Sequence, residues 1–401
     1  PGVVAVLTAK DIDGENRFGV IPDLADQPAL AEGSVRFLGE AVALVVGQAE
    51  VLEALSLADF PISWTPHPHT VTEAEGAAAG APQLHDERPE NTLIRGRVFT
   101  GDADKALGDA AHVVSGRFET SYVEHAYIEP EAGAAWLDGD QLVIRACTQA
   151  PVMDQEGTAK VLGLPKERVR IIPAAAGGGF GAKLDLSVQP LIGLAVLKTG
   201  QPCRMVFSRS ESMQASTKRH PSTMEASIGA DAVGRITGMR FHGEFNTGAY
   251  ASWGPTVATR VPVHASGPYR TPNYQATSRA VHTNGPVSGA FRGFGVPQAA
   301  ICQELLYDDL AAACGLDRLT FRRLNALRDG DRSTCGQTLI SVGLSDCLDA
   351  LQPHWDRAVE EARAFNSRSP TLKRGIGVAS CWYGCGNTAL PNPSTVRIGI
   401  T

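Results

Sequence analysis

The sequence predicts an α+β fold in which short strands and helices alternate through more than one domain. Short apolar runs rich in β-branched residues indicate the strands, and longer apolar or amphipathic stretches indicate the helices. Two glycine-rich turns, each between a strand and a helix, interrupt this pattern. With 401 residues, of which 43% are hydrophobic, the chain is long enough for two or three domains, each with its own core.

The amino-terminal region, residues 1–75, is predicted to be a small α/β domain. Its strands are expected at Pro1–Leu7, Ala41–Val46 and Ile62–Trp64, and its helix at Glu50–Leu57. Residues 76–93 are rich in Ala, Gly and Pro and are predicted to be a linker.

A larger mixed α/β domain is predicted over residues 94–330, and residues 331–401 are predicted to form a helical connection and the start of a further domain. The strands expected in this part are Val113–Glu119, Ala134–Leu137, Leu142–Ala146, Arg168–Pro173, Cys203–Ser208, Thr223–Ile228, Ile236–Glu244, Ala276–His282 and Gly375–Ser380. The helices expected are Met153–Leu162, Leu186–Lys198, Pro297–Ala313, Arg318–Ala326 and Ser345–Asn366.

Both ends of the chain have the pattern of interrupted strands. Pro1–Leu7 resembles a strand already under way, and Val396–Thr401 resembles a strand just begun. We therefore expect both ends to be cuts through folded structure. We also expect the chain to be unstable as a monomer, because unpaired strand edges are a liability.

Composition argues against several classes of protein. The formal net charge of −7 without a block of like charges gives no indication of a nucleic-acid groove or a membrane surface. No apolar run approaches the roughly 20 residues of a membrane span. The eight cysteines contain no CxxC pair, so we expect reduced, mostly buried thiols in a cytoplasmic protein and assign no side-chain metal ligands.

The two glycine-rich turns are the strongest candidates for chemistry. They are Gly177–Gly181 and Gly289–Gly295, and each is followed by a predicted helix. Glycine lets a ligand approach the backbone closely, and the amides at a helix start favour an anion. Neither turn matches a dinucleotide fingerprint or a P-loop, so structural turns and a ligand cradle both remain open on spacing alone. Each turn also carries a phenylalanine, which raises the second possibility.

The residues Gly177–Lys183 and Gly289–Gln298 resemble the two signature turns of the xanthine dehydrogenase and aldehyde oxidoreductase family, and the likeness is strongest to its nicotinate-oxidising members. Lys183–Gln189 and Gly248–Pro255 look like the same family, and Pro1–Gly19 resembles its hammerhead domain. The resemblance implies a hammerhead-type domain followed by molybdopterin-binding domains. It also implies a hydroxylase in which water supplies the oxygen and a pterin-bound molybdenum, expected in the cytosine dinucleotide form, accepts the electrons.

The family's functional residues are carried over by matching motifs. Gln149 matches the glutamine whose amide approaches a molybdenum oxygen. The first cofactor turn corresponds to Gly179, Phe180 and Gly181, and the second to Arg292. Phe294 matches the aromatic residue that packs on the substrate ring. Arg260, nine residues before Tyr269, matches the arginine that polarises or binds the substrate; it suits planar recognition of a carboxylate. We therefore expect Gln149, Arg260 and Phe294 to act in catalysis.

Two departures from the family pattern bear on substrate and activity. Leu184 stands where xanthine-oxidising members carry a glutamate. The polar edge of a bound purine would therefore lack a hydrogen-bonding partner at this position. With Arg260, Leu184 suits a less polar ring that carries a carboxylate, such as nicotinate. The family's general-base glutamate lies further downstream than Thr401, so this chain alone is expected to be inactive.

The leading hypothesis is the large molybdopterin subunit of a hydroxylase for N-heteroaromatic compounds such as nicotinate or a purine. Its expected partners are a second molybdopterin subunit with the general base, a 2Fe–2S subunit and an FAD subunit. An aldehyde oxidoreductase subunit remains an alternative. A non-catalytic scaffold half, whose partner carries the chemistry, is the third hypothesis.

Overall fold

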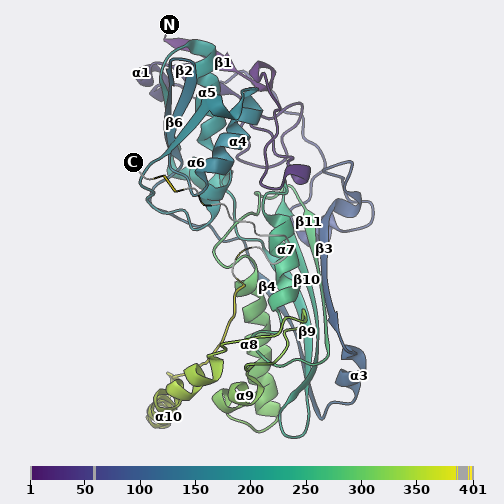
Figure 1. Ribbon diagram of the computed structural model, residues 1–401. Helices are drawn as coiled ribbons and strands as arrows, with labels where there is room; N and C mark the ends of the chain where they lie inside the picture. Colours follow the sequence, from purple (N-terminus) through teal and green to yellow (C-terminus); the bar gives the residue numbers. More distant parts are fainter. Residues whose placement is uncertain (1, 57–59, 385, 387–395, 397, 400–401) are drawn as a thin grey trace.

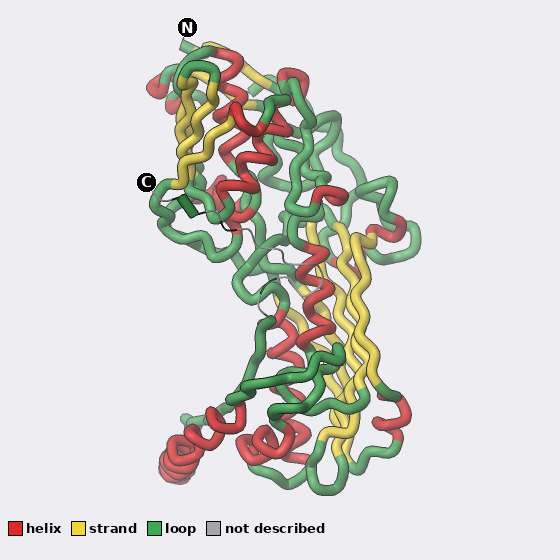
Figure 2. The backbone as a smooth tube through the Cα atoms, in the orientation of Figure 1, coloured by secondary structure: helices red, strands yellow, loops and turns green. Residues whose placement is uncertain are grey.

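The computed structural model describes residues 2–56, 60–384, 386, 396 and 398–399. It consists of two lobes that meet at a narrow middle (Figures 1 and 2). The first lobe holds the amino-terminal strands and a four-stranded sheet, and the second holds a long five-stranded sheet. No helix in the described part of the chain is both long enough and apolar enough to cross a membrane.

The four-stranded sheet of the first lobe has the order β7-β6-β5-β8, and only the β6–β7 pair is parallel. Its strands are β5 (Ala132–Asp138), β6 (Gln141–Ala146), β7 (Val169–Pro173) and β8 (Cys203–Val206). The associated helices are α4 (Pro151–Leu162), α5 (Val188–Thr199) and α6 (Arg209–Ala215). The almost wholly apolar sequence of α5 matches its burial against this sheet.

The amino-terminal strands share the core of this first lobe. The antiparallel pair β1 (Val3–Leu7) and β2 (Leu44–Gly47) precedes the short helix α1 (Ala49–Glu53). Leu7, Leu30 and Leu44 pack in one cluster with residues of β6, α4 and α5. The expected helix is therefore present but shorter; Leu57, its expected last residue, lies outside the described residues.

The strand expected at Ile62–Trp64 is wrong, because these residues form no strand and Trp64 is 63% exposed. Pro61 and Pro66 flank the segment, and proline cannot donate to a ladder. Residues 76–93, expected as a linker, contain both exposed residues and a few buried ones. They begin at the last residue of the short helix α2 (Glu73–Gly76), contain a 3₁₀ turn at Pro89–Asn91 and end in the first residues of β3 (Thr92–Thr100). The buried Asn91 side chain donates to the carbonyls of Gly76 and Pro82.

The five-stranded sheet of the second lobe has the order β3-β11-β10-β9-β4, and only the β10–β11 pair is parallel. Its strands are β3 (Thr92–Thr100), β4 (His112–Thr120), β9 (Ser222–Ala230), β10 (Ile236–Gly248) and β11 (Tyr274–His282). The helices are α3 (Ala103–Gly108), α7 (Gly254–His264), α8 (Val296–Ala313), α9 (Arg318–Asn325) and α10 (Leu344–Arg368). Figure 1 shows α7 and α8 lying along this sheet, where they close the core.

The sequence pattern misses α7 and wrongly predicts a strand at Gly375–Ser380. The α7 sequence contains Pro262 and several β-branched residues, which disfavour a helix in isolation; burial against β3 and β11 overrides that preference. Gly375–Ser380 forms no strand. Val378 instead packs against Leu319 and Trp355. The strand expected at Val396–Thr401 lies largely outside the described residues.

Candidate functional site

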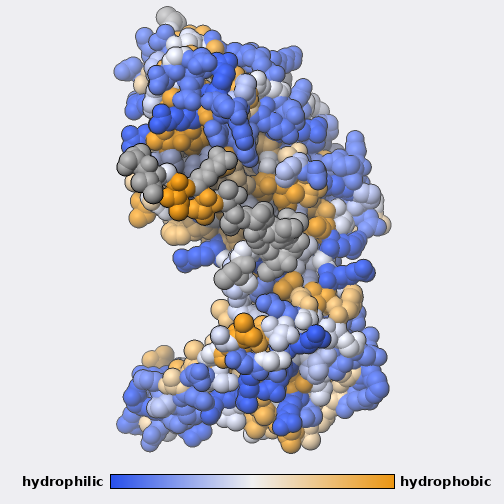
Figure 3. Space-filling view, in the orientation of Figure 1, coloured by the Kyte–Doolittle hydropathy of each residue, from blue (hydrophilic) through white to orange (hydrophobic). Residues whose placement is uncertain are grey.

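The two glycine-rich turns meet where the lobes join. The turn at residues 177–181 follows β7 of the first lobe, and the turn at residues 289–295 lies between β11 and α8 of the second. The Arg292 amide donates to the Phe180 carbonyl at 2.9 Å. A Cβ on Gly181 would lie 2.5 Å from the Ala290 carbonyl oxygen, so only glycine allows this approach. Figure 3 shows the molecule narrowing between the two lobes.

An ion pair between the buried Lys183 and the half-buried Glu129 holds the first turn. Glu129 Oε2 accepts from the Gly177 amide at 2.8 Å and from Lys183 Nζ at 2.9 Å. Lys183 is buried, and its ammonium also lies 4.6 Å from the centre of the Tyr127 ring. Burial alone would raise the pKa of Glu129, but Lys183 and the Gly177 amide outweigh it and hold this pKa below its usual range. The first turn is therefore fixed by charge.

Gln149, just beyond the end of β6, is fastened to the same turn. Its Oε1 accepts from the Gly181 amide at 2.9 Å, and its backbone amide donates to the Lys183 carbonyl at 2.9 Å. A Cβ on Gly179 would lie only 2.4 Å from that Oε1. The Gln149 side chain is exposed, and no described residue accepts from its Nε2. This arrangement leaves the NH₂ group available to a ligand beside the turn.

Stacked planar groups hold the second turn. The Phe291 ring lies between the His125 ring, 4.0 Å away and nearly parallel, and the Arg219 guanidinium at 3.9 Å. His125 Nε2 hydrogen-bonds to the Ala290 carbonyl at 2.8 Å, and Arg219 Nη2 donates to the Arg292 carbonyl at 2.8 Å. Burial lowers the pKa of His125 to about 4, so its imidazole is neutral at pH 7.

The side chains of Phe180 and Arg292 are both exposed at the point where the two turns meet. Phe180 is 45% exposed, and its φ of 53° is unusual for a bulky residue. The Arg292 guanidinium lies 5.6 Å from the centre of that ring. An exposed aromatic residue held at positive φ is a form of strain that clusters at functional sites.

Arg260 and Phe294, the expected substrate residues, lie together. Arg260 is buried on α7, with its guanidinium 5.7 Å from the centre of the Phe294 ring and 4.7 Å from that of Tyr383. Two of its nitrogens donate to the carbonyls of Gly384 and Gly386, at 3.2 and 2.5 Å. No described carboxylate pairs with Arg260, and its Nε has no described partner.

Leu184, the third expected pocket residue, follows the first turn in a 3₁₀ segment and is half-buried. No described hydrogen bond or ring contact joins it to Arg260 or Phe294. Sequence reasoning missed the supporting residues. Trp253, whose ring packs edge-on against Phe294 at 5.7 Å, lies inside the recognisable stretch Gly248–Pro255 and could have been found there. Glu129, His125, Arg219 and Tyr383 carry no such signal.

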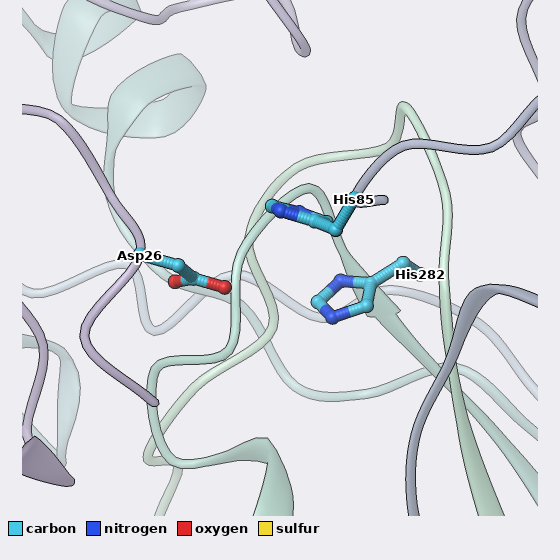
Figure 4. A group of neighbouring side chains, drawn as sticks. All are labelled: Asp26, His85 and His282. Carbon is cyan, nitrogen blue, oxygen red and sulfur yellow. The ribbon is translucent and has the colours of Figure 1, made fainter. Parts of the chain in front are cut away.

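A second cluster, Asp26, His85 and His282, brings possible metal ligands close together (Figure 4). Arg88 Nη1, however, lies 2.6 Å from both Asp26 Oδ2 and His282 Nε2. A guanidinium therefore stands where a cation would bind. His85 Nε2 and His282 Nδ1 hydrogen-bond to backbone carbonyls. We interpret this cluster as a buried network that joins the lobes.

Comparison with known proteins agrees with this geometry. Residues 84–326 match the model of the molybdopterin cofactor-binding domain. The nicotinate dehydrogenase large molybdopterin subunit of Eubacterium barkeri is 40% identical over 361 residues, which cover 90% of this chain and 83% of that protein. The xanthine dehydrogenase molybdenum-binding subunit of Escherichia coli is 30% identical, over 96% of this chain and 52% of its own length.

Among solved structures, aldehyde oxidoreductase from Desulfovibrio gigas superposes with a TM-score of 0.88 at 27% identity. The match covers 92% of this chain and 42% of that one. The chain thus spans most of the nicotinate dehydrogenase subunit but only about half of the other two proteins.

Proposed function

The chain belongs to the molybdopterin cofactor-binding family, and we propose that it is the large molybdopterin subunit of a hydroxylase that oxidises an N-heteroaromatic substrate with oxygen from water. One observation carries the proposal. The two turns, more than a hundred residues apart in sequence, meet between the lobes with Gln149 fastened to the first. Neither lobe alone would form this junction.

The residues at the junction fit the cofactor. Gly179 and Gly181 keep the backbone open where a Cβ would collide, and the Gln149 NH₂ faces outward as a donor. Gly179, Phe180, Gly181 and Arg292 would hold the pterin-bound molybdenum, and Gln149 would orient an oxygen ligand. When bound, the group accepts the electrons of the oxidation. The cytosine dinucleotide form is part of the proposal.

Arg260 and Phe294 indicate the substrate class. A buried guanidinium without a described carboxylate partner favours an anionic or carbonyl-bearing ligand, because a buried charge is otherwise uncompensated. The Phe294 ring beside it offers a stacking face for a heteroaromatic ring. Leu184 supplies an apolar edge. Nicotinate combines these features better than a purine does.

The rest of the enzyme is proposed to come from partners. A second molybdopterin subunit would bring the general-base glutamate, and 2Fe–2S and FAD subunits would carry electrons away. A cytoplasmic location is proposed for the complex. A sequence search next to the coding region for a frame with that glutamate would test the arrangement.

The direct test is turnover by the purified complex with nicotinate, purines and aldehydes, using an artificial electron acceptor. We expect nicotinate to be the best substrate and Arg260→Ala to reduce kcat/KM for it by about a hundredfold or more. Arg270→Ala, which removes a surface ion pair with Asp331, is the matched control and should have little effect. Turnover of aldehydes alone would contradict the heterocycle proposal and favour an aldehyde oxidoreductase, which Leu184 would also suit.

The scaffold hypothesis is tested separately. If this chain holds no molybdenum or pterin after co-expression with its partners, the cofactor residues proposed above are wrong.

A further inference from the structure

The loop at residues 381–384 is fastened to the helix that carries Arg260. These residues form no helix or strand, and they lie against His264, the last residue of α7. Trp382 Nε1 donates to the His264 carbonyl at 3.3 Å, and the Gly384 amide donates to His264 Nε2 at 3.1 Å. The rings of Trp382 and Tyr383 have their centres 5.6 and 6.2 Å from that of the His264 ring. His264 therefore holds this loop through both its ring and its backbone.

Gly384 connects His264 to Arg260. Arg260 Nη1 donates to the Gly384 carbonyl at 3.2 Å, while the amide of the same glycine donates to His264. His264 lies four residues after Arg260 on α7, so the two side chains leave the same face of the helix. Gly384 is thus held at its amide by one side chain and at its carbonyl by the other. A change at His264 reaches the Arg260 guanidinium through this single residue.

The hydrogen bonds of His264 require one tautomer of its ring. Nδ1 lies 3.0 Å from the Arg260 carbonyl oxygen, which can only accept, so Nδ1 carries the hydrogen. Nε2 is then the acceptor that the Gly384 amide needs. Burial lowers the pKa of His264, so its ring is neutral at pH 7 and Nε2 is free to accept. The link to Gly384 therefore depends on an acceptor at the position of Nε2.

The guanidinium that this loop holds still has donors for a ligand. Arg260 is buried, and a guanidinium has five N–H donors. The carbonyls of Gly384 and Gly386 each accept one hydrogen bond from it, and no described carboxylate pairs with its charge. An arginine already held in one orientation loses little further side-chain freedom when it binds a carboxylate, which favours affinity.

We propose that His264 is a positioning residue for substrate binding: it holds Gly384 so that the Arg260 guanidinium meets the substrate carboxylate in a fixed orientation. The proposal rests on the proposed function, in which Arg260 binds the substrate. His264 acts through Arg260, and no bond is made or broken in this role. The carboxylate takes no part in the oxidation, so Arg260 binds it equally in the substrate and in the transition state. Loss of His264 should therefore raise KM and leave kcat nearly unchanged.

The test compares His264→Leu with His264→Gln in the assembled, molybdenum-loaded complex. Leucine cannot accept from the Gly384 amide, whereas the side-chain oxygen of glutamine can replace Nε2 as the acceptor. We expect His264→Leu to raise KM for nicotinate by about tenfold, with kcat within about twofold of the wild type. His264→Gln should keep KM within about threefold of the wild type. An unchanged KM in His264→Leu, a loss in kcat alone, or an equal rise in KM in both variants would overturn the proposal.

A double variant separates the positioning of Arg260 from a general disturbance of the pocket. If His264 acts through Arg260, adding His264→Leu to Arg260→Ala should not raise KM further, because the positioned side chain is already absent. A further rise of about tenfold in the double variant would overturn the proposal. His242→Leu, which changes an exposed histidine on β10, is the control and should leave KM for nicotinate unchanged.

Two measurements need no turnover and so separate this inference from the proposed function. In His264→Leu, but not in His264→Gln, hydrogen exchange at residues 381–384 should be about tenfold faster than in the wild type. Benzoate, an aromatic carboxylate without a ring nitrogen, should bind His264→Leu about tenfold more weakly in calorimetry. Unchanged exchange or unchanged benzoate affinity would overturn the inference even in an active enzyme. Both losses in a complex that oxidises no N-heteroaromatic compound would support the positioning role and count against the proposed function alone.

Should His264→Leu fail to assemble, Trp382→Phe removes the other hydrogen bond between the loop and His264. It should raise KM for nicotinate and quicken exchange at residues 381–384, each by about threefold. Unchanged values of both in that variant would overturn the proposal.

Discussion

The two glycine turns share a sequence layout but are held by different forces. The first is fixed by the Lys183–Glu129 ion pair, in which only the lysine is buried, and by hydrogen bonds from the turn's own amides. The second is fixed by the stacking of Phe291 between His125 and Arg219. Both turns must keep their shape for the junction to form, since each places one backbone group on the other. The shared glycine motif therefore specifies the backbone shape of each turn, but not the interactions that hold the turn in place.

The largest effect is expected where the two turns touch. Gly181→Ala would place a Cβ 2.5 Å from the Ala290 carbonyl oxygen at a φ of 117°, so it should lower the free energy of unfolding by about 3–5 kcal/mol. Gly139→Ala is the control, because Gly139 has a φ of 62° with open space around it. It should cost about 1 kcal/mol. Denaturant unfolding of both variants checks the difference; equal costs would mean that the turns do not touch as described.

A smaller effect is expected from removing the charge that supports only the first turn. Lys183→Met leaves Glu129 without its cation, at a cost of about 2–3 kcal/mol because the carboxylate is partly open to water. Hydrogen exchange should quicken at residues 177–181 more than at residues 289–295. Equally faster exchange in both turns would show that the two turns are not held by separate interactions.

Mild acid should loosen the second turn first. The pKa of His125 is lowered to about 4, below its unfolded value of 6.5, so the neutral ring stabilises the fold above pH 6.5 and this contribution is lost as the pH falls toward 4. At about pH 5 the loss amounts to about 2 kcal/mol. The pKa of Glu129 is held below its usual value, so the first turn keeps its ion pair at that pH. Hydrogen exchange measured at pH 7 and pH 5 would reveal the difference, and His125→Gln should remove it.

The smallest effect is expected from the exposed Phe180–Arg292 pair. A double-mutant cycle of Phe180→Leu and Arg292→Leu should give a coupling of about 0.5–1 kcal/mol, typical of an exposed cation–π pair. A coupling indistinguishable from zero would mean that only the backbone bond between these residues joins the turns.

Periodicity predicted most of the strands and helices and both turns, because these depend on local pattern. It failed where tertiary packing decides: α7 is helical despite Pro262, and Ile62–Trp64 is not a strand despite its β-branched and aromatic residues. Motif resemblance supplied Gln149, Phe180, Arg260, Arg292 and Phe294. The structure brings these residues to the junction as two groups, one at the turns and one at α7.

The residues that hold the two turns could not be predicted in the same way. Glu129 and His125 are single residues in loops, far in sequence from the turns that they hold. Such roles depend on contacts that only the folded chain defines.

The measurement that tests the central claim most directly is the molybdenum and pterin content of the purified complex carrying Gly179→Ala. A Cβ at this position collides only with the far end of the flexible Gln149 side chain, so the fold should survive while the cradle is disturbed. We predict about one molybdenum per chain in the wild type and in Gly139→Ala, and a severalfold lower content in Gly179→Ala. A Gly179→Ala complex with the full content of both would contradict the assignment of the cofactor to this junction.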